Sequence, residues 1–191
     1  MERHQFSASE IGDREILDME PEEAIERLMD LYGEELKRLA YSYTKNWMQT
    51  DDLIQEVFLS IYQKLHTFNG KSALKSWIYS IAINKCKDYL RSWHYRKLQL
   101  TDHWMTTGKT QGNGPMENVI QQDENKKLIE AVLELPIKYR EVIVLFYYKD
   151  MNIDEICQML SLSPSAVKTR LHRGREKLRM SHSLEGGMLN G

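Results

Sequence analysis

Apolar residues recur at intervals of three and four along most of the chain, which is the spacing of one face of an α-helix. Strands would require alternation with a period of two, and such runs are poor in this sequence. The pattern therefore predicts an all-α fold. The predicted helices are Pro21–Asn46, Asp51–Leu65, Ser72–Tyr95, Asp123–Leu135, Ile137–Lys149, Ile153–Leu160 and Pro164–Arg179.

Glycine and polar residues interrupt this pattern between residues 98 and 121. A stretch of this length without a periodic apolar stripe is either a linker or a functional crossing segment. We therefore expect two small helical domains joined by a flexible linker. The expected segments are an acidic N-terminal extension (1–20), a first domain (21–97), the linker (98–121), a second domain (122–180) and a disordered tail (181–191).

The strongest local signal is a helix-turn-helix pattern in the second domain. Ile153, Ile156 and Leu160 form an apolar face, and Ser163 followed by Pro164 is a favourable start for the next helix. The outer face of that helix is polar and basic. Basic residues on the outside of a helix often do no more than keep that face in contact with water. Here they follow a capped turn after an apolar helix, which favours contact with the DNA major groove. The side chains expected to face DNA are Ser165, Lys168, Thr169, His172 and Arg173.

The predicted helix at 51–65 has one apolar face and one polar face. Gln55 and Glu56 point away from the apolar face, with Leu59 and Ser60 beside them. An outward Leu59 is either a patch for a protein partner or an ordinary surface leucine.

In the helix at 72–95, the apolar stripe makes Trp77 a core residue rather than a base-stacking one. The side predicted to be exposed has an Asn among basic residues, an arrangement that can read a base edge while its neighbours hold phosphates. Ile83 on this side is either a wedge against an unstacked base or a plain surface residue. The exposed polar residues are Ser80, Asn84, Lys87 and Arg91, with Tyr79 and Ile83 beside them.

A short loop, Phe68-Asn69-Gly70-Lys71-Ser72, precedes this helix. Glycine allows close backbone approach and lysine supplies positive charge, so the loop can hold a base that has left the duplex.

The formal net charge of −2 conceals a strong asymmetry, because acidic residues dominate Glu10–Glu35 and basic residues dominate Lys168–Arg179. The basic end can therefore meet phosphate, while the acidic end faces a protein or solvent. The sequence has no secretory core and no run approaching the roughly 18 apolar residues of a membrane span. Cys86 and Cys157 lie outside any metal or redox spacing. These features favour a cytoplasmic protein with free thiols.

Taken together, these segments resemble the extracytoplasmic-function (ECF) sigma factors, which belong to the sigma-70 family of RNA polymerase subunits. DDLIQEVFLSIYQKL resembles the region 2 helix that docks on core polymerase, and FNGKSALKSWIYSIAINKCKDYL resembles the segment that melts DNA and reads the minus-10 element. LPIKYREVIVLFYYKDMNIDEICQMLSLSPSAVKTRLHRGREKLR resembles region 4, which reads the minus-35 element.

This resemblance implies core RNA polymerase and promoter DNA as partners, with control by an anti-sigma factor that in some relatives is membrane-anchored. It implies a role in stress response, a linker that threads toward the polymerase active-site region, and no catalytic residue, metal, cofactor or small-molecule substrate. The implied polymerase contacts are Asp52, Gln55, Glu56 and Leu59. The implied minus-10 contacts are Phe68, Asn69, Gly70, Lys71, Ser80, Asn84, Lys87 and Arg91. The implied minus-35 contacts are Ser165, Lys168, Thr169, His172 and Arg173.

The sequence departs from many relatives at two positions, where Ile83 replaces an arginine and Gly174 replaces an alanine. A rival interpretation is a helix-turn-helix repressor or activator that binds two half-sites as a dimer. A small helical hydrolase or transferase is a second rival, but the sequence has no catalytic triad, phosphate-binding glycine loop or metal-ligand cluster. His66, His94 and His103 are scattered.

Overall fold

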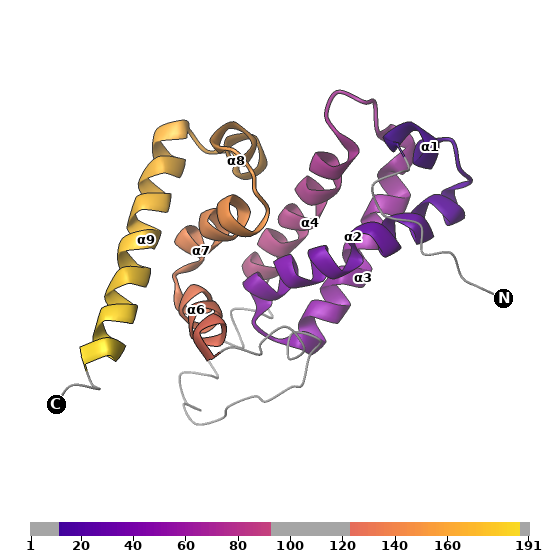
Figure 1. The fold of residues 1–191 in the computed structure, drawn as a ribbon. Coiled ribbons are helices and arrows are strands. Elements are labelled where there is room, and N and C mark those ends of the chain that lie inside the picture. Colours follow the sequence, from indigo (N-terminus) through magenta and orange to yellow (C-terminus); the bar gives the residue numbers. More distant parts are fainter. Residues whose placement is uncertain (1–11, 93–122, 188–191) are drawn as a thin grey trace.

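The computed structural model describes residues 12–92 and 123–187, and within these ranges its regular elements are all helical. The expected linker, His94 and His103 lie outside the described residues. The helices form two groups that lie side by side, α1–α4 and α6–α9 (Figure 1). We call these groups the N-terminal and C-terminal domains.

The N-terminal domain is built around two long antiparallel helices. Its elements are α1 (Asp13–Leu17), α2 (Pro21–Thr44), α3 (Trp47–Lys64), the short 3₁₀ turn η1 (Leu65–Thr67) and α4 (Leu74–Arg91).

Local signals explain the ends of these helices. α2 has proline in its first turn and ends at Thr44, after which Lys45 adopts a left-handed conformation with φ 54°. Asn46 Oδ1 then accepts a hydrogen bond from the Gln49 amide at 3.1 Å, which is why α3 begins at Trp47 rather than at the predicted Asp51.

The C-terminal domain contains a helix-turn-helix. Its elements are α6 (Asp123–Glu134), α7 (Ile137–Ile143), the single π-turn η3 (Val144–Tyr148), α8 (Ile153–Leu160) and α9 (Pro164–Gly187).

The last helix is longer than predicted. α9 passes the predicted end at Arg179 because no glycine or proline follows Arg179 until Gly186 and Gly187. The expectation of a tail without structure from residue 181 is therefore wrong for the described part, where Ser181 Oγ donates to the carbonyl of Leu178 at 2.9 Å.

The two domains share an interface in which α2 and α4 pack against α7 and α8. Tyr79 and Ile83, which the sequence pattern predicted on an exposed face, are fully buried. The prediction fails because α4 is covered on two sides, once by its own domain and once by the other domain. The periodicity of one helix gives no sign of the second cover.

One smaller prediction of burial is also wrong. Ser60 was expected to point outward, but it is buried and its Oγ donates to the Glu56 carbonyl at 2.8 Å. Leu128 of α6 is 44% exposed at the domain interface. Among the described residues, no helix combines the length and apolar character that membrane crossing requires.

Candidate nucleic-acid interface

The turn between α8 and α9 is fixed by local hydrogen bonds. α8 begins with a capping box, in which Asn152 Oδ1 accepts from the Glu155 amide and Glu155 Oε2 accepts from the Asn152 amide. It ends at Ser161, which is left-handed with φ 55°. Ser163 Oγ then accepts from the Ala166 amide at 3.3 Å. These caps set the angle at which α9 leaves the turn.

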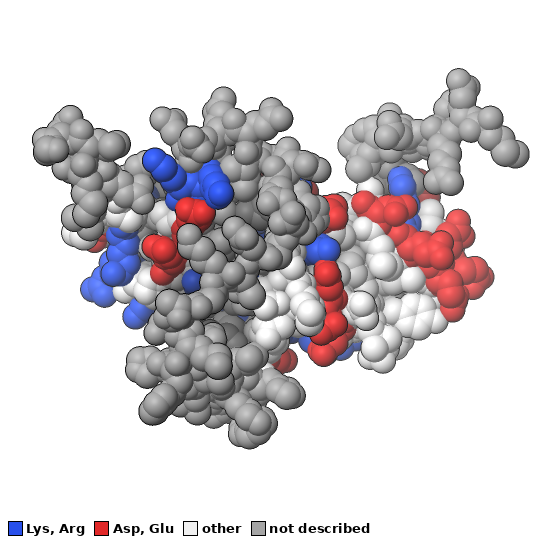
Figure 2. Space-filling view, turned by 90° about the horizontal axis from the view of Figure 1, so that it is seen from below, with Lys and Arg blue, Asp and Glu red and all other residues white. Residues whose placement is uncertain are grey.

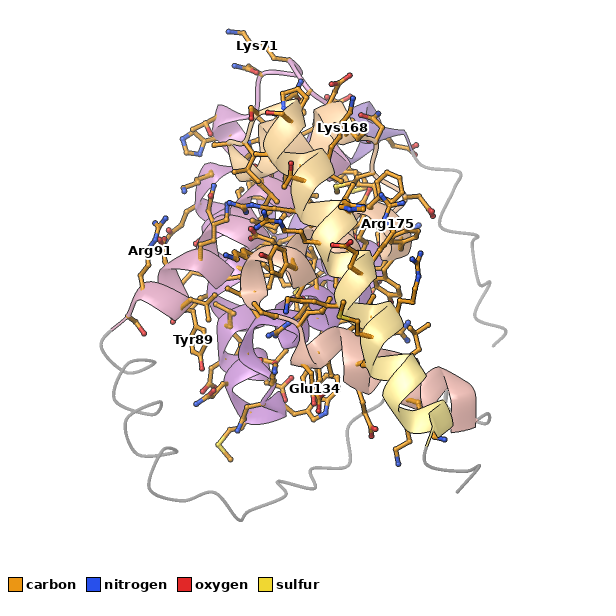
Figure 3. All side chains as sticks on the ribbon, turned by 90° about the vertical axis from the view of Figure 1, so that its left-hand side faces the viewer. Lys71, Tyr89, Arg91, Glu134, Lys168 and Arg175 are labelled. Atoms are coloured by element: carbon orange, nitrogen blue, oxygen red, sulfur yellow. The ribbon has the colours of Figure 1, made fainter. Side chains whose placement is uncertain are left out.

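The side chains predicted to read the minus-35 element lie together on the outer face of α9. Val167 and Leu171 bury the inner face, so the outer face projects into solvent (Figure 3 shows Lys168 and Arg175 along this helix). His172 Nε2 lies 3.4 Å from Glu176 Oε1, an ion pair only when the imidazole is protonated. The exposed residues of the predicted set are Ser165, Lys168, Thr169, His172 and Arg173.

A basic hollow of about 350 Å³ lies where the start of α7 meets the first three turns of α9. Lys138 and Tyr139 line it from α7, and Arg170 and Arg173 line it from α9 together with the hydroxyl groups of Ser165 and Thr169. The Arg173 guanidinium beside the Tyr139 hydroxyl lowers the pKa of that phenol, and the Lys138 ammonium lies 5.0 Å from the centre of the Tyr139 ring. Cations and hydroxyl groups in one concave site suit a phosphate.

Lys138 was missed by the sequence analysis. The available signal was a lysine two residues after Pro136, at the start of a helix. Only the fold shows that this start lies beside α9. Arg170 is less available for a phosphate, because its Nη1 forms an ion pair with Glu141 Oε1 at 2.8 Å. Lys138 and Arg173 are therefore the cations of the hollow with the most freedom to meet DNA.

The loop that precedes α4 has a defined turn. Asn69 Oδ1 accepts from the Lys71 amide at 3.2 Å, and Gly70 between them has a φ of 70° that favours glycine. The Phe68 ring packs on Trp77 with their ring centroids 5.4 Å apart, which anchors the loop to α4. Asn69 and Lys71 are exposed, and Figure 3 shows Lys71 at one end of the molecule.

The predicted minus-10 residues of α4 do not all share one environment. Asn84 and Arg91 are exposed, and Arg91 Nη1 lies 3.5 Å from Asp88 Oδ1. Ser80 is half-buried and its Oγ donates to the Trp77 carbonyl at 2.7 Å. Lys87 is half-buried and its Nζ donates to the Leu160 carbonyl at 3.5 Å. The structure thus brings the loop and Asn84 to the surface but turns Ser80 and Lys87 toward internal acceptors.

The predicted polymerase contacts lie on the exposed face of α3. Asp52, Gln55 and Glu56 are exposed, and Leu59 has 56% of its surface open to solvent. Glu56 Oε2 lies 3.5 Å from Lys85 Nζ of α4, across a groove of about 470 Å³ between the two helices. An apolar side chain beside carboxylate and amide groups is a surface suited to a protein partner.

Charge is distributed unevenly over the molecule. In the view of Figure 2, the largest group of acidic side chains lies at the end that holds α1, and most visible basic side chains lie at the opposite end, near α9. Among the described residues, no cluster of three or more His, Cys, Asp or Glu side chains has the arrangement of a metal site.

Comparisons with known proteins agree with this architecture. The chain matches the family models for sigma-70 region 2 over residues 28–95 and for sigma-70 region 4 over residues 125–178. The chain therefore belongs to the sigma-70 family of RNA polymerase sigma factors, and its relatives place it in the ECF group.

Two Bacillus subtilis proteins illustrate the relationship. The ECF RNA polymerase sigma factor SigW is 30% identical over 165 residues, which cover 83% of this chain and 88% of SigW. The ECF RNA polymerase sigma factor SigX is 32% identical over 161 residues, which cover 83% of each chain.

Two solved structures share the fold. The sigma factor RpoE of Bartonella quintana, in complex with the anti-sigma factor NepR, aligns with a TM-score of 0.66 and 19% identity over 81% of this chain and 94% of RpoE. CnrH, in complex with the cytosolic domain of CnrY, aligns with a TM-score of 0.62 and 23% identity over 90% of this chain and 94% of CnrH.

Proposed function

We propose that three separate surfaces divide the work of transcription initiation. The α3 face, with Asp52, Gln55, Glu56 and Leu59, binds core RNA polymerase. The 68–71 loop and α4 hold separated bases of the minus-10 element, and α9 reads the minus-35 duplex. The observation that carries this proposal is the spatial separation of an exposed α3 face from two surfaces suited to nucleic acid, all within one sigma-70 fold.

The α9 surface is suited to duplex DNA. Its outer side chains donate hydrogen bonds to base edges, and the hollow formed by Lys138, Arg170 and Arg173 accepts a backbone phosphate. Each such phosphate contact releases condensed counterions, so binding weakens as salt rises.

The loop and α4 are suited to open DNA. Opening duplex DNA costs about 1.4 kcal/mol of stacking per base-pair step, so the capture of one or two extruded bases offsets a useful part of that cost. Asn84 can pair with a base edge, while Lys71 and Arg91 supply positive charge for the strand that has separated.

We further propose that an anti-sigma factor controls the protein in the cytoplasm and that the chain itself has no catalytic activity. The support is that the RpoE structure contains an anti-sigma factor and that the sigma-70 family acts on transcription through polymerase. The described residues 21–92 and 123–180 fit the proposed division into a region 2 domain (21–97) and a region 4 domain (122–180), with a linker between them.

A transcription assay tests the function directly. Purified protein is mixed with core RNA polymerase and genomic promoter fragments, and defined transcripts that depend on both components are expected. Tight binding of the isolated protein to a palindromic duplex, with no association with core polymerase, would instead support the repressor interpretation.

Two substitutions separate the proposed DNA surfaces. We expect Asn84→Ala to reduce open-complex formation more than protection of the upstream duplex, and Arg173→Ala to reduce mainly upstream protection. Both are measured with holoenzyme by permanganate reactivity and footprinting. Gln63→Ala on α3 and Lys177→Ala on α9 are controls at exposed positions. Equal losses in both assays for Asn84→Ala would contradict its assigned role.

A further inference from the structure

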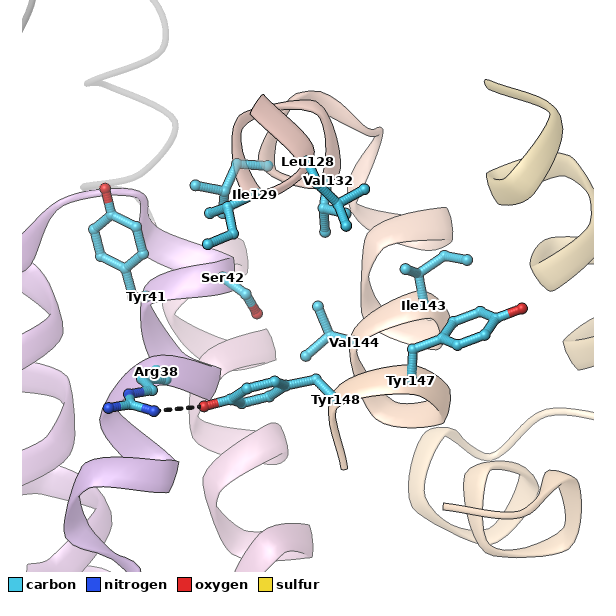
Figure 4. Close-up of a pocket in the computed structure, with 11 residues that line it drawn as sticks. Arg38, Tyr41, Ser42, Leu128, Ile129, Val132, Ile143, Val144, Tyr147 and Tyr148 are labelled. Atoms are coloured by element: carbon cyan, nitrogen blue, oxygen red, sulfur yellow. Dashed lines mark hydrogen bonds between the residues drawn. The ribbon is translucent and has the colours of Figure 1, made fainter. Parts of the chain in front are cut away.

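A cavity of about 290 Å³ lies between α2 and the first elements of the C-terminal domain. Its walls come from α2 on one side and from α6, α7 and η3 on the other (Figure 4). Ligand pockets in proteins range upward from about 300 Å³, are lined mainly by apolar and aromatic side chains, and contain a few polar groups that orient the ligand. The cavity falls at the small end of that range.

The apolar walls of this cavity are only partly covered by protein. Leu128 of α6 is 44% exposed, and Ile129 and Val132, which line the cavity beside it, are half-buried. Tyr147 and Tyr148 of η3 are 53% and 46% exposed, and they belong to a single π-turn, an element found frequently at functional sites. Water in an apolar cavity has few hydrogen-bond partners, so an apolar group displaces it readily.

One end of the cavity is polar and carries a positive charge. Arg38 Nη1 donates to the Tyr148 hydroxyl at 3.1 Å, the contact drawn in Figure 4. This acceptor is a neutral phenol, which uses one of the five N–H donors of the guanidinium and none of its charge. A guanidinium binds a carboxylate through two parallel hydrogen bonds, so Arg38 is suited to a carboxylate ligand.

Two carboxylates of the chain, those of Glu34 and Glu35, also act on Arg38. Glu35 Oε2 already lies 3.0 Å from Lys149 Nζ and accepts a hydrogen bond from the Tyr79 hydroxyl. Glu34 is exposed and four residues before Arg38 on the same helix, where water weakens its attraction. An incoming carboxylate therefore competes mainly with Glu34.

The volume of the cavity sets the size of the ligand. An apolar cavity of about 150 Å³ lined by aliphatic and aromatic side chains holds one benzene molecule. The cavity of about 290 Å³ beside α2 therefore holds roughly twelve non-hydrogen atoms. Decanoate, which joins an unbranched apolar chain to a carboxylate, has about this number of atoms.

We propose that this cavity binds an amphiphilic carboxylate, with the apolar chain against α6 and the carboxylate on Arg38. The two ends of the cavity match the two ends of such a molecule, because Leu128, Ile129 and Val132 lie at one end and Arg38 lies at the other (Figure 4). The site is separate from the surfaces of α3, α4 and α9, which contribute no lining residue. A ligand that binds only the folded chain stabilises it in proportion to the ligand concentration, so this site offers a route for control by a small molecule.

Calorimetric titration of the full chain with sodium decanoate tests the site. Decyltrimethylammonium has a similar chain and a positive head group, so it separates charge complementarity from apolar occupancy. Val132→Trp fills the cavity, and Arg38→Gln removes its cation. Lys127→Gln is the matched control, because Lys127 is an exposed cation of α6 that does not line the cavity. Circular dichroism checks that each variant keeps its helical content.

The parent chain should bind decanoate with a Kd below about 1 mM and should bind decyltrimethylammonium at least about tenfold more weakly. Arg38→Gln should weaken decanoate binding about tenfold, because it removes hydrogen bonds to a charged group, whereas Lys127→Gln should stay within about twofold of the parent. Val132→Trp should abolish binding. Glu34→Gln should strengthen binding about twofold, because it removes the competing carboxylate. Nuclear Overhauser contacts between the decanoate chain and Leu128 should locate the bound molecule.

Several results would overturn the inference. Absence of decanoate binding at about 1 mM would show that the cavity is not a site for this class of ligand. Equal binding of decyltrimethylammonium would show that Arg38 does not select a carboxylate, and binding unchanged by Val132→Trp would place the ligand elsewhere. A dimer that Val132→Trp abolishes, seen by sedimentation in a chain that does not bind decanoate, would assign this face to a second copy of the chain.

The titration needs neither DNA nor polymerase. A failure of the parent protein to support transcription would therefore count against the proposed function and not against the carboxylate site.

Discussion

Two helical glycines in contrasting surroundings allow the packing of α9 to be tested. A Cβ atom at Gly174 would lie 2.9 Å from Ile143 Cγ1 and 3.2 Å from Ile143 Cδ1. A Cβ atom at Gly33, within α2, would have no neighbour within 4 Å. The two sites therefore separate the intrinsic helix preference of alanine from the cost of filling an occupied space.

The expected magnitudes follow from these contacts. Alanine in place of glycine within a helix stabilises by about 1 kcal/mol, and Gly33→Ala should show this gain in full. At Gly174 the buried Ile143 side chain must move, because carbon atoms attract optimally at about 3.5–4.0 Å. Overpacking of this kind costs about 1–3 kcal/mol. Gly174→Ala should therefore be neutral or destabilising by up to about 2 kcal/mol.

Urea unfolding followed by circular dichroism measures both variants, with unchanged slopes as the check that the unfolded states are comparable. Combining Ile143→Val with Gly174→Ala removes one of the two close atoms, so the double variant should lose less than the sum of the single losses. A gain for Gly174→Ala equal to that for Gly33→Ala would refute the close approach of α9 to α7.

Two further predictions concern the hollow beside α9 and the cysteines. Lys138→Gln should weaken holoenzyme binding to different promoter sequences to a similar extent. It should also reduce the slope of log affinity against log salt concentration by about 1. An unchanged slope would show that Lys138 does not contact a phosphate. Burial raises the pKa of the Cys86 thiol to about 12. A thiol reagent at pH 8 should therefore label the half-exposed Cys157 well before Cys86, as measured by mass spectrometry. Equal labelling rates would contradict the burial of Cys86 in α4.

The parts of the fold that could be predicted from the sequence are those set by local chemistry. The all-α class, the range Ile153–Leu160 and the start at Pro164 agree with the structure because caps and apolar spacing act within one or two turns. The start of α3 was missed because Asp51 and Asp52 resemble a helix N-terminus, whereas Asn46 supplies the actual cap.

Features that depend on distant segments could not be predicted in this way. Ile83 is buried because another domain covers α4, and Lys138 lines the phosphate hollow because the first turn of α7 lies against the first three turns of α9. Neither fact has a signature in the spacing of residues along one helix. The assignments of Asn84 and Arg173 to DNA remain predictions, although both residues are exposed where the proposed surfaces require.

The contact between Lys87 and α8 has a consequence for how the protein can diverge. Its acceptor is a main-chain oxygen at the carboxyl end of a helix, where carbonyl groups lack intrahelical donors and the dipole favours a cation. Any residue type at position 160 presents the same atom. Substitutions in α8 can therefore change its apolar packing while the hydrogen bond from Lys87 to this carbonyl is kept. Among side chains, only Lys87 itself is needed for this bond.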